Sequence, residues 1–115
     1  MASILVVDRD LQVRELYEKA LKAVGHRVHC VEDGKEALED IGLRAPGATF
    51  NVMITNMVNV MAGDKLSVEV RKKSPTTKII MISTLPFSGE NHRCDMILQK
   101  PVSMDLLVKA VACFA

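Results

Sequence analysis

The stretch Ser3-Ile4-Leu5-Val6-Val7-Asp8 decides the fold, because it is a continuous apolar run that ends in an acid. Such a run is typical of a strand buried on both faces. Similar runs follow along the chain, at Val52–Thr55 before Asn56, at Lys78–Ile82 before Ser83, and at Met96–Leu98 before Gln99 and Lys100. A short strand is also predicted over Arg27–Val31.

Helical stripes of apolar residues separate these strands. The first predicted helix is Leu11–Val24, with Val13, Leu16, Tyr17, Ala20 and Val24 inward. The second begins at Asp33-Gly34, with Ala37, Leu38 and Ile41 inward, and the third is Leu66–Lys73, with Leu66 and Val70 inward. The last is capped by Ser103, with Met104, Leu107, Val111 and Phe114 inward. Strand and helix alternate along the whole chain. The pattern predicts an α/β fold, a doubly wound five-stranded parallel sheet in one domain over residues 1–115.

Composition narrows the classes of function. The chain has 115 residues, 49% of them hydrophobic and 25% charged, with a net charge of +1 and 3% aromatic residues. General disorder is excluded, and nothing in the overall charge favours nucleic acid or an anionic membrane. Cys30, Cys94 and Cys113 lack paired spacing, and His26, His29 and His92 lack metal-ligand spacing. With no apolar segment of membrane-spanning length and no signal-peptide pattern, we expect a cytoplasmic protein with reduced, mostly buried thiols.

Polar residues gather where the predicted strands end, and function in such sheets gathers at the same edge. They are Asp8-Arg9-Asp10, Thr55-Asn56, Ser83-Thr84 and Lys100-Pro101. Together with Ile4–Asp8, Glu32–Leu38 and Lys78–Ser83, they carry a resemblance. The chain resembles the receiver domain of two-component response regulators, of bacterial type, over essentially its whole length. The resemblance implies the flavodoxin-like (βα)₅ receiver fold.

The same resemblance implies a role for each residue at these strand ends. In that family an acidic pair holds Mg²⁺, an Asp after the third strand accepts a phosphoryl group, and a hydroxyl and a Lys contact that group. Asp8 matches the first acid, Ser83 the hydroxyl and Lys100 the lysine. Arg9 stands where the second acid belongs, and Asn56 stands at the acceptor position. An amide is a poor nucleophile and a guanidinium repels a cation, so phosphorylation and metal binding are not expected.

Other passages depart from the family pattern as well. The loop Asn59–Asp64 differs from the usual one, and Ile97 occupies the position of the aromatic switch residue. The interval from Ser83 to Lys100 is short by about one helical turn or more. We therefore expect a short or irregular fourth helix.

These observations predict a pseudo-receiver in two-component signal transduction, not an enzyme, that acts through protein–protein contacts. Its pseudo-active-site pocket comprises Asp8, Arg9, Asp10, Asn56, Ser83 and Lys100. No cofactor is expected, and Asp8 and Asp10 are the candidates for residual metal binding.

Partners are expected to be a histidine kinase or an output protein, bound at the face of the fourth helix, fifth strand and last helix or at the loops rimming the pocket. The alternative is a working phosphorelay receiver that uses Mg²⁺ and a non-standard acceptor; a flavodoxin-like cofactor binder is disfavoured because an acidic loop repels phosphate.

For several of these residues, a purely structural role remains an alternative to a role in the pocket or in binding. Asp10 is equally suited to cap the first helix, whereas a buried Asp8 needs a donor or a cation, for which Arg9 or Lys100 is the candidate. The apolar residues Met57, Val58, Val60, Met61, Leu85 and Phe87 form either a contact patch or part of the core. The basic residues Lys65, Arg71, Lys72, Lys73 and Lys78 are interpreted as a solvated face.

Overall fold

The computed structural model describes residues 2–44, 48–57, 60–83 and 94–114, without the side chains of 57 and 60–64, and strands and helices alternate in it from Ser3 to Ser83. The elements run β1 (Ser3–Val7), α1 (Leu11–Ala23), β2 (Arg27–Val31), α2 (Gly34–Leu43), β3 (Val52–Met57), α3 (Val60–Lys73), β4 (Lys78–Ser83), β5 (Met96–Gln99) and α4 (Met104–Ala112). All strand pairs are parallel, and the strand order is β2-β1-β3-β4-β5. The predicted doubly wound parallel sheet is thereby confirmed.

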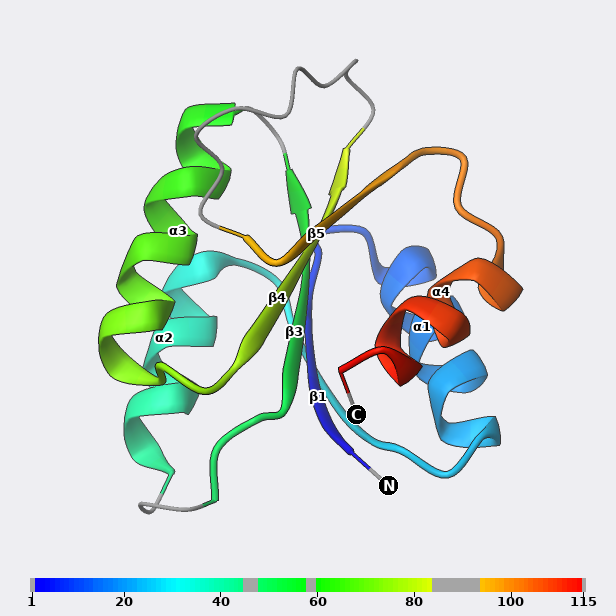
Figure 1. The fold of residues 1–115 in the computed structure, drawn as a ribbon, viewed down its shortest axis with the longest axis horizontal. Helices are drawn as coiled ribbons and strands as arrows, with labels where there is room; N and C mark the ends of the chain where they lie inside the picture. The colour runs from blue at the N-terminus through cyan, green and yellow to red at the C-terminus, as the bar shows by residue number, and fades with distance from the viewer. Residues whose placement is uncertain (1, 45–47, 58–59, 84–93, 115) are drawn as a thin grey trace.

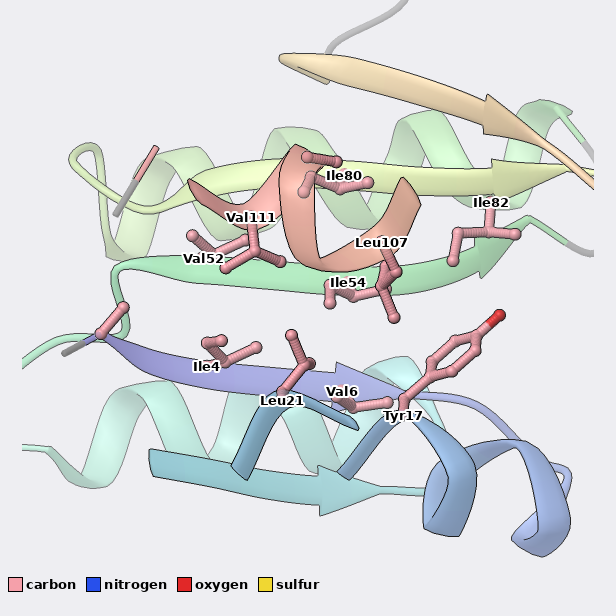
Figure 2. Packing of buried hydrophobic residues seen from close by; sticks show 12 residues of the cluster. Ile4, Val6, Tyr17, Leu21, Val52, Ile54, Ile80, Ile82, Leu107 and Val111 are labelled. Atoms are coloured by element: carbon pink, nitrogen blue, oxygen red, sulfur yellow. The ribbon is translucent and has the colours of Figure 1, made fainter. Parts of the chain in front are cut away.

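The two faces of the sheet carry separate layers of helices (Figure 1). Helices α1 and α4 lie against one face, and α2 and α3 lie against the other. Side chains alternate along each central strand, so Ile4 and Val6 pack toward α1 and α4 while Leu5 and Val7 pack toward α2 and α3. Figure 2 shows the first of these clusters, in which Leu107 lies beside Ile54 and Val111 beside Val52. This double burial explains why the central strands are apolar without interruption.

Side-chain caps fix where three of the helices begin. Asp10 accepts a hydrogen bond from the backbone N–H of Gln12, Asp33 from that of Glu36, and Ser103 from that of Leu106. Each acceptor satisfies a helix-terminal N–H that has no partner inside the helix. Helix α1 is followed by Gly25 at a φ of 96°, a left-handed conformation that glycine adopts without strain.

The structure corrects several details of the sequence-based prediction. Leu16 and Val24 were expected on the inward stripe of α1 but are 51% and 52% exposed, because Tyr17 and Leu21 define the buried face. Helix α3 begins at Val60, six residues before the predicted start. Cys30 and Cys94 are only half-buried and Cys113 is exposed, so the thiols are less buried than predicted. The expected fourth helix, between Ser83 and β5, falls on 84–93, outside the described residues.

None of the described helices is long and apolar enough to cross a membrane.

Candidate functional site

The strand ends named by the sequence lie at one edge of the sheet. Asn56 is the penultimate residue of β3 and is paired with Ile82 of β4, next to the pair Met57 and Ser83. Ser83 is buried, and its backbone carbonyl accepts a hydrogen bond from the backbone N–H of Lys100 at 2.7 Å. Asn56 on β3, Ser83 on β4 and Lys100 directly after β5 therefore lie at the carboxyl ends of neighbouring strands. The Lys100–Pro101 peptide is cis.

Asp8 and Asp10 lie after β1, at the same edge of the sheet, and make different hydrogen bonds. Asp8 follows β1 and is only 5% exposed, and its Oδ1 accepts a hydrogen bond from the backbone N–H of Asp10 at 2.9 Å. Asp10 is exposed, and its own Oδ1 caps α1 through the N–H of Gln12 at 2.9 Å. The capping role that the sequence left open for Asp10 is thus observed.

The expected ion pair with Asp8 does not form. Among the described residues, neither Arg9, which is exposed, nor Lys100 makes an ion pair with Asp8. The nearby cation is Arg14 of α1, whose Nη1 donates to the backbone carbonyl of Asp8 at 2.7 Å. Its Nη2 lies 3.9 Å from Oε1 of Glu32, so Arg14 links the ends of β1 and β2.

Sequence reasoning missed Arg14 and the role of Tyr17 at this edge. Arg14 is one helical turn after Asp10, a spacing that directs its side chain back toward the start of α1. Tyr17 is buried, and Figure 2 shows its ring directed toward the carboxyl ends of the strands. Burial raises the pKa of the Tyr17 hydroxyl, and the negative charge of Asp8 raises it further. The phenol therefore stays neutral near a buried carboxylate.

The switch position Ile97 and three of the predicted apolar loop residues lie in strands or helices. Ile97 lies on β5, pairs with Met81 and packs against the core on the α2 and α3 face. Met57 ends β3, and Val60 and Met61 begin α3, so these three belong to regular elements and not to loops. Their side chains, and residues Val58, Leu85 and Phe87, lie outside the described part of the chain. The choice between a contact patch and a core stays a prediction.

Residues 4–112 match the model of the response regulator receiver domain. The chain belongs to the receiver domain family. Its role as a receiver domain in two-component signalling follows from this match and from the fold.

This receiver domain is similar to several known proteins. It is 29% identical to the sensor histidine kinase RcsC of Salmonella typhimurium over 97% of the chain, but spans only 12% of that protein's length. It is also 29% identical to the two-component response regulator ARR17 of Arabidopsis thaliana, over 88% of this chain and 76% of that protein.

Solved structures agree on the fold. The chemotaxis protein CheY4 of Vibrio cholerae is 28% identical, with a TM-score of 0.83 over 100% of this chain and 99% of that one. The response regulator TrrA of Thermotoga maritima, solved in complex with Mg²⁺ and BeF, is 25% identical with a TM-score of 0.80 and covers 100% of both chains.

Proposed function

We propose that this receiver domain is a pseudo-receiver that signals through protein contacts and does not accept a phosphoryl group. The observation that carries the proposal is Asn56 at the end of β3, beside the strand ends that hold Ser83 and Lys100. In the family this position belongs to the aspartate that attacks phosphorus. An amide carries no negative charge, and its nitrogen lone pair is delocalised, so Asn56 is a poor nucleophile.

The donor set around Asn56 is also unsuited to Mg²⁺, which needs several hard oxygen ligands in near-octahedral geometry. One oxygen of Asp8 already accepts from Asp10, and the carboxylate of Asp10 caps α1. Among the described residues, no group of three His, Cys, Asp or Glu side chains is placed to hold a metal ion. Arg9 adds a positive charge where the family has an acid, so we infer that the pocket holds no resident Mg²⁺.

Protein contacts are then the remaining route for a signal. TrrA has been solved in complex with the histidine kinase ThkA, and it resembles this chain with a TM-score of 0.82 at 25% identity. We propose that this domain likewise binds signalling proteins, either a histidine kinase or an output protein. We assign it no enzymatic activity of its own.

Restoring the two lost acids tests whether Asn56 and Arg9 are what prevents phosphorylation. In the double variant Arg9→Asp with Asn56→Asp, we expect Mg²⁺ and beryllofluoride to shift amide NMR signals at residues 8–10, 56, 83 and 100. The wild type should show no such shifts, because it lacks both the nucleophile and the ligands. The matched control is Lys19→Glu, a charge change at an exposed position of α1 that leaves the pocket residues unchanged. Saturable wild-type shifts at the same residues would contradict the proposal.

A further inference from the structure

A basic surface lies at the opposite edge of the molecule, where α2 and α3 end and β4 begins (Figure 1). We name this the basic corner, and its exposed residues are Leu43, Arg44, Lys72, Lys73 and Lys78. The chain as a whole has a net charge of +1, whereas the basic corner holds four cations. The sequence placed three of these lysines on a solvated face; the structure adds Leu43 and Arg44 to them.

Contacts with the buried residue Phe50 position Arg44 and the start of β4 within the basic corner. The guanidinium of Arg44 lies 3.7 Å above the centre of the Phe50 ring, and its Nη1 donates to the carbonyl of Ala48 at 3.0 Å. The hydroxyl of Thr77 donates to the carbonyl of Phe50 at 2.7 Å, which fixes the turn that leads into Lys78. Arg44 and the start of β4 are thus both anchored to Phe50.

The side chain of Lys73 on α3 reaches toward the end of α2 within this corner. Its ammonium nitrogen lies 3.8 Å from the place that a Cβ on Gly42 would occupy, directly before Leu43. Lys72 has an acidic neighbour, Glu69, at 3.4 Å, but both side chains are largely exposed and such pairs contribute little. Within the described ranges, neither Lys73 nor Lys78 has an acidic partner at all.

Leu43 adds an apolar centre to this charged surface. It is 83% exposed, the largest exposed fraction among the large hydrophobic residues of the described chain. Helix C-termini favour cations, which accounts for Lys72 and Lys73. The helix dipole gives no reason for an exposed leucine, nor for a lysine at the start of a strand. Like charges on one surface repel each other, and a surface of opposite charge that covers them offsets this repulsion and buries the leucine beside them.

We infer that the basic corner is a docking surface for an acidic protein segment that carries an apolar side chain. The carboxylates of such a segment would pair with Lys73, Lys78 and Arg44, and its apolar side chain would cover Leu43. Nucleic acid fits less well, because the described part of the corner presents no exposed aromatic ring for stacking. This surface is at the amino ends of the strands, away from Asn56, so its occupancy is independent of the state of the pocket.

A labelled acidic peptide with one central leucine tests this inference, together with a matched peptide in which serine replaces the leucine. Fluorescence anisotropy at low and moderate salt should show binding that weakens with salt and with loss of the leucine. Lys73→Glu and Lys78→Glu should each raise the Kd about tenfold, since each reverses a charge-assisted contact. Lys19→Glu, the same charge change on α1, should leave the Kd within about twofold. Leu43→Ser should abolish the difference between the two peptides.

Three results would overturn the inference. They are an equal loss with Lys19→Glu, no dependence on Leu43, and stronger binding to heparin or to phosphatidylserine vesicles than to the peptide. Circular dichroism of each variant checks folding, and Lys73→Gln provides a milder change if Lys73→Glu unfolds. The double variant Arg9→Asp with Asn56→Asp should bind the peptide like the wild type. Failure of the pocket proposal therefore leaves this test intact.

Discussion

Asn56 and Arg9 are the single residues on which the proposed loss of phosphorylation depends. We propose that Asn56 stands at the acceptor position, where it keeps almost the shape of an aspartate without its charge, and that Arg9 reverses the charge of the second acid. Asp8 remains buried with a backbone N–H of Asp10 on one oxygen and the guanidinium of Arg14 at its own carbonyl. These neighbours belong to the chain itself, so we propose that the pocket is stable without a metal ion.

His26 provides a pH-dependent contact away from the pocket. Its Nδ1 accepts a hydrogen bond from the backbone N–H of Ala2 at 3.0 Å, which secures the start of β1. Burial lowers the pKa of His26 below its ordinary value of 6.5, and the positive N-terminal amine lowers it further. The unfolded chain therefore binds the proton more readily than the folded chain does. Stability from this contact is present above pH 6.5 and is lost as the pH falls through and below that value.

Urea unfolding checks this prediction at about pH 8 and about pH 5. The wild type should lose more free energy of unfolding between the two than His26→Asn, whose amide does not titrate. Equal losses in the two proteins would contradict the assigned role of His26.

Substitutions of Asp10, the N-cap of α1, distinguish the effect of its capping oxygen from the effect of its charge. Asp10→Ala removes the acceptor for the N–H of Gln12 and should lower the free energy of unfolding by about 1 kcal/mol. Asp10→Asn should retain most of that stability, because asparagine is an equally good N-cap. Chemical denaturation of the three proteins measures the difference. A similar loss in both variants would indicate that the charge of Asp10, not its capping oxygen, is what stabilises the protein.

Helix α4 offers a matched pair of leucines at adjacent positions. Leu107 is 0% exposed in the core between α1, α4 and the sheet, whereas Leu106 is 44% exposed. Leu107→Ala should cost about 2–5 kcal/mol through lost burial and a new cavity. Leu106→Ala should cost no more than about 0.5 kcal/mol. Urea unfolding distinguishes the two, and equal costs would mean that α4 packs with a different face.

The strands were predictable from sequence because burial on both faces leaves an uninterrupted apolar run. The buried faces of the helices were less predictable from sequence. The predicted apolar stripe of α1 includes Leu16 and Val24, but Leu16 lies on the exposed side of the helix and Val24 is exposed directly after its end. Spacing alone does not give the rotation of a helix on its sheet, which depends on the neighbouring α4. Arg14 was missed for a related reason, since its partners are the carbonyl of Asp8, which follows β1, and a carboxylate after β2.

At the scale of the whole molecule, the two edges of the sheet carry different features. The carboxyl edge holds Asp8, Asn56, Ser83 and Lys100, and the amino edge holds the basic corner around Leu43. Strand order and chain direction bring the first group to the same edge, because all strands of the sheet are parallel. The basic corner depends on where two helices end, so its members were visible in sequence only as scattered lysines.

Intact-protein mass spectrometry of the wild type after incubation with Mg²⁺ and acetyl phosphate tests whether this receiver domain accepts a phosphoryl group. The Arg9→Asp and Asn56→Asp double variant serves as the positive comparison. We predict that the wild-type mass stays unchanged, because the amide of Asn56 is a poor nucleophile. A labile gain of one phosphoryl group on the wild type would contradict the account and establish a working receiver with another acceptor.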